Sequence, residues 1–311
     1  MTPDRSAAAS NGETMARTFT LRPYAKINLT LRVGARDSSG YHDVRTVLQS
    51  IGLADKLRVM ERRGPFALGV SGRGVPEDRT NLVWRAAEQL WRRAGRVGDP
   101  QGVHIHLTKN IPVGAGLGGG SANAAATLVA LNKVWDVKLP AQDLVSIGAD
   151  LGADVPFFLC GGTAVGVGRG AEVYPLTDAP RLGVVIIKPS FSVSTAEAYG
   201  WFDADRAAEV ADGARRPARR VDLGWPTGPV QLDNDLQLPV GRRHPAVGEM
   251  VEACLAQGAR AALMTGSGSA VFGLFDGLAA ARAARRLQRP DWLVIPTRTV
   301  NRREAGRGMS L

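Results

Sequence analysis

The 311-residue sequence has little of what disulfide-bonded or membrane-spanning proteins need. It contains two cysteines, Cys160 and Cys254, which lie far apart in the chain. This scarcity excludes a disulfide framework and a cysteine-based metal site, and it favours a reducing cytoplasm. No apolar run approaches the roughly 18 residues that a membrane-spanning helix requires. We therefore expect a cytoplasmic protein that has no membrane partner.

Aromatic residues are also scarce, at 6% of the chain, although the formal net charge is +10. The basic excess lies in three arginine-rich segments without interleaved aromatic residues, at 215–220, 282–289 and 298–307. A surface that stacks nucleic-acid bases needs such aromatic residues, so a solvated arginine surface is the better interpretation and we expect no nucleic-acid partner. A basic nucleic-acid-binding module is the alternative of a different class, and it predicts strongly salt-sensitive binding of RNA or DNA.

The length of the chain and its hydrophobic content of 44% suit two domains, each with its own core. Residues 1–18 contain no apolar segment of the kind found in secretory signals, and we expect a disordered extension over 1–17. An N-terminal domain is expected at 18–177 and a C-terminal domain at 178–311.

The most informative stretch is a glycine-rich loop between a predicted strand at 103–107 and a predicted helix at 121–134. Five glycines fall within seven residues, namely Gly114, Gly116, Gly118, Gly119 and Gly120. Glycine allows positive φ and leaves backbone amides accessible, and a helix start adds partial positive charge, so phosphate is the expected ligand. A dinucleotide-binding fold would need an acidic residue after a second strand, and a Walker A loop would need Gly-Lys-Ser/Thr. A flexible linker is the remaining alternative.

The segment PVGAGLGGGSANAA resembles the second sequence motif of the GHMP small-molecule kinases. In that superfamily the loop wraps the phosphates of ATP, and a third motif, here Met264 to Phe272, turns back against it. The resemblance implies ATP as cosubstrate, with Mg²⁺ carried by its phosphates and no assigned protein metal ligand. The nucleotide contacts that it implies are Asn81, Lys109, Pro112, Gly114, Gly116, Leu117, Gly118, Gly119, Gly120, Ser121, Asn123, Gly266 and Ser267. For Asn81 a helix N-cap is an alternative, and for Lys109 a surface position is an equal one.

Polar residues near the N-terminus form a second group of candidates. Lys26, Asn28 and Thr30 alternate with Ile27, Leu29 and Leu31 on a predicted strand, so the two sets face opposite sides. From local sequence alone, Lys26 and Asn28 could simply be solvated. A polar turn at 37–42 then ends in Tyr41 and His42, which could either pack or offer a stacking face and hydrogen bonds.

The stretch AKINLTLRVGARDSSGYHDVRTVLQSI closely resembles the N-terminal motif of the family of 4-diphosphocytidyl-2-C-methyl-D-erythritol kinases. The chain has Ser39 where this family usually has aspartate, and both residues suit a turn. The resemblance implies that Lys26 and Asn28 lie at the acceptor side of the site. It also implies that Tyr41 stacks on the cytosine ring and that His42 hydrogen-bonds the edge of this ring.

Further family motifs lie at LGADVPFF and at PSFSVST. Spacing alone leaves Asp154 evenly divided between a turn or cap and a functional carboxylate, because charged groups are seldom left unpaired in apolar settings. The resemblance implies that Asp154 faces the acceptor hydroxyl and that Lys26 stabilises the charge on the transferred phosphoryl group. It implies a substrate contact for Thr195 and a second stacking ring for Tyr199, whose alternative is a core position.

Apolar periodicity and turn residues predict the remaining elements. They are strands at 18–33 with a bend at Pro23, strand-like sequence at 46–70 with a turn at 52–55, a helix from 82 to about 94, a helix at 140–151, a hairpin at 161–173, a strand at 182–188, a short helix holding Tyr199, an irregular excursion at 207–229, a helix at 247–257, a strand, turn and strand at 261–275, a helix at 279–288 and a strand at 292–299.

Together these features imply an α+β chain with the two-domain GHMP kinase fold. We expect an N-terminal mixed α/β domain with a left-handed βαβ-type ATP loop and a ferredoxin-like C-terminal domain. The implied activity is ATP-dependent phosphorylation of the 2-hydroxyl of a small molecule with a cytidine diphosphate moiety, by a monomer or weak homodimer. The nearest rival is a GHMP kinase for mevalonate-type, homoserine or sugar acceptors, which would not need the Gly-Tyr-His turn.

Overall fold

Three β-sheets organise the residues that the structure describes, and the first two are built mainly from the N-terminal part of the chain. The computed structural model describes residues 17–38, 40–72, 74–211, 232–277 and 279–309. The first sheet has the strand order β1 (Thr18–Leu21), β4 (Lys56–Pro65), β6 (Gln101–Thr108), β5 (Ala67–Ser71). The second has the order β10 (Asp233–Asn234), β2 (Tyr24–Arg36), β3 (His42–Ala54), β7 (Thr163–Val167), β8 (Glu172–Pro175).

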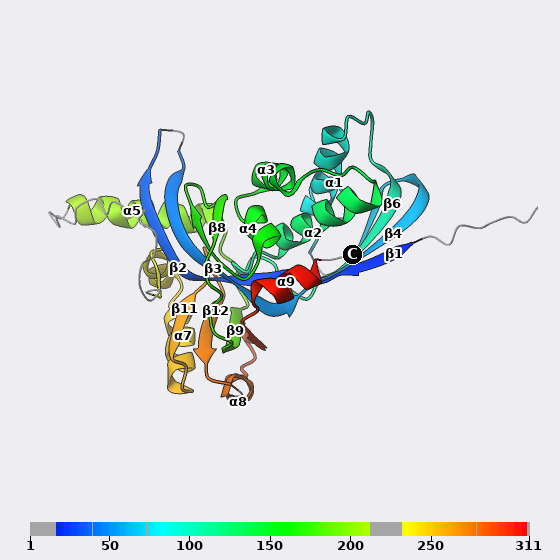
Figure 1. The fold of residues 1–311 in the computed structure, drawn as a ribbon. Coiled ribbons are helices and arrows are strands. Elements are labelled where there is room, and N and C mark those ends of the chain that lie inside the picture. The colour runs from blue at the N-terminus through cyan, green and yellow to red at the C-terminus, as the bar shows by residue number, and fades with distance from the viewer. Residues whose placement is uncertain (1–16, 39, 73, 212–231, 278, 310–311) are drawn as a thin grey trace, which may run out of the picture.

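Four helices cover one side of these two sheets (Figure 1). They are α1 (Leu82–Arg93), α2 (Gly119–Val134), α3 (Ala141–Leu151) and α4 (Val155–Cys160). α2 is built mainly from alanine and leucine, which favour the helix, and it is buried over most of its length because α1, α3 and α4 all pack on it. The start of α2, which directly follows the glycine-rich loop, is therefore held in place by the largest of the three apolar clusters that the described residues form.

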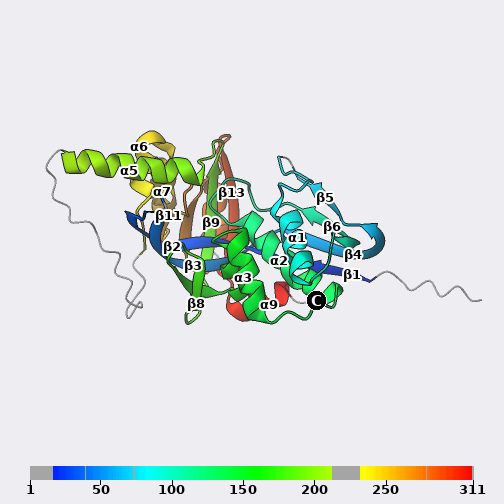
Figure 2. The ribbon, with the colours of Figure 1, turned by 90° about the horizontal axis from the view of Figure 1, so that it is seen from above.

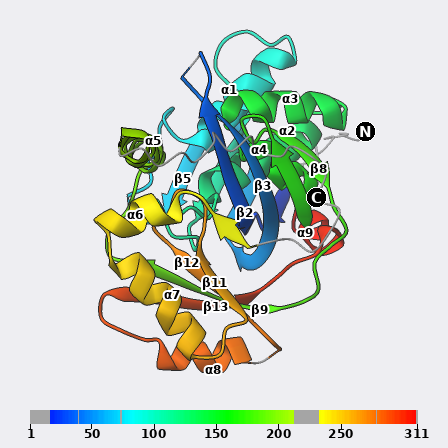
Figure 3. The same cartoon turned by 90° about the vertical axis from the view of Figure 1, so that its left-hand side faces the viewer.

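The C-terminal part contains the third sheet, whose strands are all antiparallel to their neighbours. Its order is β11 (Ala261–Met264), β12 (Val271–Phe275), β9 (Gly183–Pro189), β13 (Trp292–Arg298). In chain order this is the 4-1-3-2 arrangement of a ferredoxin-like domain, which confirms that expectation. α7 (Ala246–Ala256) and α8 (Ala279–Arg286) pack against one face of this sheet, and both are seen in Figure 3.

The two parts share a core and exchange elements. Apolar residues of β2 and β3, of the glycine-rich loop and of the third sheet pack into one cluster. α9 (Arg302–Gly308) returns from the C-terminal part, and the Gly308 carbonyl accepts a hydrogen bond of 2.7 Å from the Arg22 amide. α5 (Thr195–Ala211) lies beside α6 (Gln237–Arg243) and leads away from the body of the molecule (Figure 2). The predicted domain boundary at 177/178 falls between β8 and β9 and stays a prediction.

Most predicted elements are confirmed, and three expectations need correction. β3 continues through Gly52 to Ala54, so the predicted turn at 52–55 is confined to the residue before β4. The helix that holds Tyr199 is long, and residues 207–211 belong to it instead of to an irregular excursion. The helices α4, α6 and α9 have no counterpart among the predicted elements. The predictions for 1–16, for Ser39 and for 212–229 lie outside the described residues.

Candidate active site

The glycine-rich loop adopts the conformations that its glycines make possible. Gly114, Gly116 and Gly118 have φ of 65°, 72° and 71°, and Gly118 caps the start of α2. A Cβ atom at Gly116 would lie 2.1 Å from the carbonyl oxygen of Thr265, so only glycine fits there. The loop thus leads directly into the N-terminus of a 16-residue helix. This confirms the predicted arrangement for binding an anion.

The loop between β11 and β12 packs directly on the glycine-rich loop. The Thr265 hydroxyl lies 3.4 Å from the Gly116 carbonyl oxygen, and it accepts a hydrogen bond of 3.0 Å from the backbone amide of Asn28. The Ser267 hydroxyl lies 3.2 Å from that of Thr195 at the start of α5. The predicted return of the third motif against the first glycine-rich loop is therefore confirmed.

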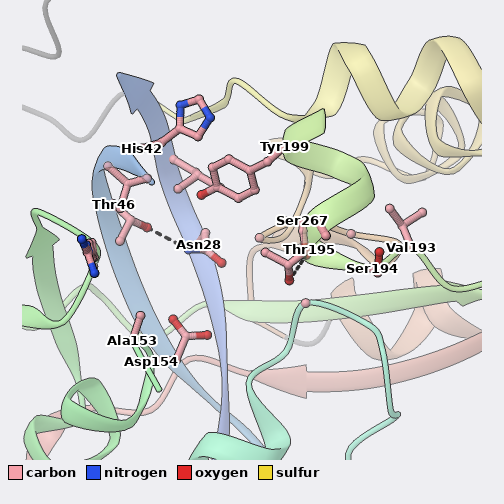
Figure 4. A pocket seen from close by; sticks show the side chains of 18 of the residues that line it. Asn28, His42, Thr46, Ala153, Asp154, Val193, Ser194, Thr195, Tyr199 and Ser267 are labelled. Carbon is pink, nitrogen blue, oxygen red and sulfur yellow. Dashed lines mark hydrogen bonds between the residues drawn. The ribbon is translucent and has the colours of Figure 1, made fainter. Parts of the chain in front are cut away.

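Two cavities meet at the glycine-rich loop. The larger, of about 860 Å³, opens between β2, β3, α5 and the two loops, and Figure 4 shows residues that line it. The smaller, of about 350 Å³, lies between the glycine-rich loop and the segment around Asn81. Gly114, Gly116, Gly118 and Ser121 line both cavities. The loop is therefore placed to hold a group shared by a ligand in each cavity.

A lysine and a carboxylate meet in the larger cavity. The Lys26 ammonium nitrogen is 3.4 Å from a carboxylate oxygen of Asp154 and donates a hydrogen bond of 2.7 Å to Asn28 Oδ1. Lys26 and Asn28 are 3% and 4% exposed, so the interpretation of a solvated strand face is wrong. Asp154, at the start of α4, keeps 38% of its side chain accessible. The pair thus places one fixed positive charge beside one accessible carboxylate.

The Asn28 side chain holds this lysine in place through hydrogen bonds to several neighbouring residues. Its Oδ1 accepts from Lys26 and, at 3.2 Å, from the Thr265 hydroxyl, while its Nδ2 donates to Thr46 Oγ1 at 2.8 Å. The Thr46 hydroxyl in turn donates to the Thr30 carbonyl oxygen at 2.7 Å. These contacts span β2, β3 and the loop after β11, so the position of the ammonium group depends on all three.

Two aromatic residues predicted for substrate binding lie close together at the cavity wall. The ring centroids of His42 and Tyr199 are 5.2 Å apart (Figure 4). Burial, with a smaller effect of the Asp154 charge, raises the pKa of the Tyr199 phenol to about 12. Tyr199 therefore remains a neutral phenol at physiological pH. Tyr199 is partly buried, lines the cavity and also packs against the apolar core of the C-terminal part, so its role as a stacking ring stays a prediction.

Tyr41 lies on the rim of the same cavity and is 57% exposed. The Arg169 guanidinium, from the turn between β7 and β8, lies 4.1 Å from the centroid of the Tyr41 ring. Such a cation–π contact favours one orientation of an otherwise mobile ring.

A buried carboxylate organises the smaller cavity. Asp55 has no exposed side-chain area, and its Oδ1 accepts hydrogen bonds of 2.6 and 2.8 Å from the amides of Asn110 and Ile111. Its Oδ2 accepts from the Lys109 ammonium and, at 2.9 Å, from Asn123 Nδ2. The alternative of a surface lysine at position 109 is therefore wrong, since 8% of its side chain is exposed.

Asn81 is the N-cap of α1, as its predicted alternative role required. Its Oδ1 accepts a hydrogen bond of 2.9 Å from the Val83 amide, and its Nδ2 donates to the Pro76 carbonyl oxygen at 2.7 Å. It lines the smaller cavity with Asn123, whose Oδ1 accepts no hydrogen bond from the described residues. A nucleotide contact of Asn81 stays a prediction.

All of the site residues predicted from sequence line one of the two cavities. The larger is lined by Lys26, Asn28, Tyr41, His42, Gly114, Gly116, Gly118, Ser121, Asp154, Thr195, Tyr199, Gly266 and Ser267. The smaller is lined by Asn81, Lys109, Pro112, Gly114, Gly116, Leu117, Gly118, Gly119, Gly120, Ser121 and Asn123. Sequence reasoning missed the side chains that hold these residues, namely Thr46, Asp55, Arg169, Asp203 and Thr265. For Asp55 the one available signal was a lone carboxylate between two apolar strands.

Among the described ranges, no helix combines the length and apolar character needed to cross a membrane. Within the same ranges, no group of three or more histidine, cysteine or acidic side chains is placed to hold a metal ion.

Comparison with known proteins identifies what this arrangement resembles. Two protein families match parts of the sequence. Residues 81–162 match the GHMP kinases N terminal domain, and residues 223–290 match the GHMP kinases C terminal family. The chain is 45% identical to the 4-diphosphocytidyl-2-C-methyl-D-erythritol kinase of Moorella thermoacetica over 91% of this chain and 99% of that protein. It is 38% identical to the Geobacter sulfurreducens protein of the same name, over 91% of this chain and 99% of that one.

Solved structures agree with these sequence relationships. A crystal structure of 4-(cytidine 5′-diphospho)-2C-methyl-D-erythritol kinase superposes with a TM-score of 0.70 at 34% identity, covering 90% of this chain and 99% of the other. A homoserine kinase from Cytophaga hutchinsonii superposes with a TM-score of 0.66 at 18% identity, covering 94% and 98%. The second likeness shows the fold alone, and it supports the two-domain α+β architecture.

Proposed function

Since the chain belongs to the 4-diphosphocytidyl-2-C-methyl-D-erythritol kinases, a family of GHMP kinases, we propose that it phosphorylates the 2-hydroxyl group of 4-diphosphocytidyl-2-C-methyl-D-erythritol. ATP supplies the γ-phosphoryl group, and the products are ADP and the 2-phosphate of the substrate. The reaction belongs to the non-mevalonate route to isoprenoid precursors.

One observation carries the assignment of the reacting groups. The glycine-rich loop separates two cavities and lines both, and the Lys26–Asp154 pair lies in the larger one. Phosphoryl transfer depends on positioning and on stabilisation of charge more than on covalent chemistry. A nucleotide in the smaller cavity would place its terminal phosphates at the loop, with the acceptor alcohol on the other side.

The nucleotide side is assigned to the loop, to the N-terminus of α2 and to the residues around Asp55. Backbone amides at positive-φ glycines and the helix N-terminus bind the phosphates. Mg²⁺ would be held by the phosphate oxygens, with the Ser121 hydroxyl at the junction of the cavities as a protein contact. When bound, the ion neutralises charge on the transferred group. Lys109 and Asn123 then contact the nucleotide from positions fixed by Asp55.

The acceptor side is assigned to Asp154, Lys26 and Asn28. Asp154 accepts the proton of the attacking hydroxyl or orients that hydroxyl, because its carboxylate is accessible from the cavity. Lys26 stabilises the negative charge on the phosphoryl group from its buried, hydrogen-bonded position. Asn28 fixes Lys26 through its Oδ1 and retains donor capacity on Nδ2 for the substrate.

The base-binding side is assigned to Tyr41, His42 and Tyr199, with Thr195 near the sugar or diphosphate. Stacking on an aromatic ring contributes about 1–3 kcal/mol per base. Tyr199 is held by its burial and by contact with His42. Tyr41 is held by Arg169. We further expect the enzyme to act in the cytoplasm as a monomer or weak homodimer.

The deciding experiment measures ADP release from Mg-ATP with three alcohols in parallel. ADP formed with the cytidyl substrate but not with mevalonate or homoserine supports both the reaction and the acceptor. ADP formed with another alcohol alone would retain the kinase activity and refute the cytidyl acceptor. Absence of ADP with every alcohol, from folded protein, would refute the kinase assignment.

A further inference from the structure

His42 uses both of its ring nitrogens inside the protein. Nδ1 lies 3.0 Å from the carbonyl oxygen of Gly34, a group that can only accept a hydrogen bond. Nε2 lies 3.2 and 3.3 Å from the two carboxylate oxygens of Asp203. The His42 side chain is 6% exposed. Both ring nitrogens of His42 already face oxygen atoms of the protein, which leaves little of the ring available to hydrogen-bond the edge of a base.

Asp203 brings a carboxylate to the wall of the larger cavity. It lies four residues after Tyr199 on α5, so both side chains are on the same face of that helix. Both residues line the cavity, and 36% of the Asp203 side chain remains exposed. An ionised carboxylate has about four acceptor positions and no donor. Contact with His42 therefore leaves Asp203 able to accept hydrogen bonds from a ligand.

We propose that Asp203 selects cytosine over uracil by accepting a hydrogen bond from the amino group at position 4 of the base. This inference rests on the proposed function, and it adds a specificity-determining residue to it. Uracil carries a carbonyl oxygen at that position, which would face the carboxylate with both groups acceptors. Two acceptors that face each other lose a hydrogen bond and repel, so a site built to accept a hydrogen bond from a ligand discriminates against an analogue that lacks the donor.

The contact with His42 gives this carboxylate its position. Nδ1 faces the carbonyl oxygen of Gly34 and Nε2 faces the carboxylate of Asp203, so the ring donates to both groups when each nitrogen carries a hydrogen. The nearby Asp205 serves as a contrast on the same helix. It forms ion pairs with Arg242 and Arg243 and does not line the cavity. Of these two aspartates on α5, the one that lines the cavity is the one that contacts a histidine.

The test compares cytidyl and uridyl substrates in four proteins. Wild type, Asp203→Ala and Asp203→Asn are assayed with the 4-diphosphocytidyl substrate and with its 4-diphosphouridyl analogue. Glu209→Gln is the control, because this substitution removes the same charge from α5 at a residue that does not line the cavity. One correctly read base edge discriminates by about 10–100-fold. We expect the cytidyl-to-uridyl ratio of kcat/KM to fall by about that factor in both Asp203 variants, chiefly through KM, and to stay constant in Glu209→Gln.

A binding measurement separates this inference from the proposed activity. Calorimetry with CDP and UDP reads base selection without any turnover. Tighter binding of CDP by wild type, lost in both Asp203 variants, supports the inference even where no ADP is formed. A ratio that changes by less than about 3-fold, or equal losses for both bases, would show that Asp203 only braces His42 and would overturn the inference, while the phosphorylation assay could still succeed.

Discussion

Replacement of Asp55 by asparagine tests how the smaller cavity is built. The structure places the whole carboxylate out of contact with solvent, against a lysine that is 8% exposed. Asparagine can keep one oxygen toward the amides of Asn110 and Ile111, at the site of the present Oδ1. Its NH₂ group would then face the ammonium of Lys109 and Nδ2 of Asn123, which are both donors.

The magnitude follows from the burial of this pair. Removing one partner of a buried ion pair leaves an uncompensated charge and costs about 3–5 kcal/mol. We expect Asp55→Asn to lower the free energy of unfolding by that amount. The KM for ATP should rise at least about 10-fold, which corresponds to about 1.4 kcal/mol, because Lys109 and Asn123 lose their common anchor.

Urea unfolding followed by circular dichroism measures the stability, and steady-state kinetics measure the KM. Asp136→Asn is the matched control, since Asp136 pairs with Lys138 at 3.1 Å with about three quarters of both side chains exposed, 75% and 76%. It should cost less than about 1 kcal/mol. Adding Lys109→Met to Asp55→Asn removes the stranded charge and should restore much of the stability, while the KM stays high. A loss below about 1 kcal/mol in Asp55→Asn would refute the reasoning.

Three further predictions concern turnover, the glycine-rich loop and pH. Asp154→Asn should keep substrate affinity by calorimetry while kcat falls by about 10²–10⁴-fold, and unchanged turnover in a folded variant would exclude proton transfer to Asp154. Gly116→Ala should lower the Tm and raise the KM for ATP, because its Cβ would lie 2.1 Å from the Thr265 carbonyl oxygen, whereas Gly120→Ala, whose Cβ meets nothing closer than 3.4 Å, should leave the Tm unchanged. Burial, and then two neighbouring basic groups, lowers the pKa of His104 from its ordinary 6.5. The unfolded chain therefore binds a proton that the folded imidazole resists, so stability should be full above pH 6.5 and fall below it, and His104→Gln should flatten this slope in urea unfolding.

The features that sequence could predict depend on local patterns. The glycine-rich loop, the strand before it and α2 follow from composition and spacing within thirty or so residues. The strands and helices around the third sheet likewise follow from their apolar periods, whereas the ferredoxin-like arrangement was an implication of the family resemblance. The resemblance to a family then supplied roles for Lys26, Asp154 and Tyr199 that spacing alone left open.

The environment of Lys26 and Asn28 shows where local reasoning stops. Alternation on β2 places both on a polar strand face, and such faces are usually solvated. In the structure they are buried because Gly118 of the glycine-rich loop lies against the Lys26 side chain, while Gly266 and Thr265 of the loop after β11 lie against Asn28. The hydrogen bond from Asn28 to Thr265 joins residues that are 237 positions apart. No window of sequence contains the two partners.

Asp55 and Asp203 were missed for related reasons. Asp55 is the last residue of a predicted turn, where aspartate is common for purely local reasons. Its partners lie 54 to 68 positions later in the chain. Asp203 lies on a helix whose length was underestimated, because the arginine-, proline- and glycine-rich sequence after 207 suggested an earlier end. Its partner His42 lies 161 positions earlier, in the second sheet.

The hydrogen bonds of Asn28 explain why the site needs both parts of the chain. The oxygen that orients the Lys26 ammonium also accepts from the Thr265 hydroxyl, and Thr265 shapes the loop that limits Gly116 to glycine. A shift of the third sheet relative to β2 would therefore move the phosphate loop and the lysine together. With the proposed placement of the two substrates, packing between the two parts would set the distance between the phosphoryl donor and the acceptor, so a substitution at that shared core should alter kcat before it alters the affinity for either substrate alone.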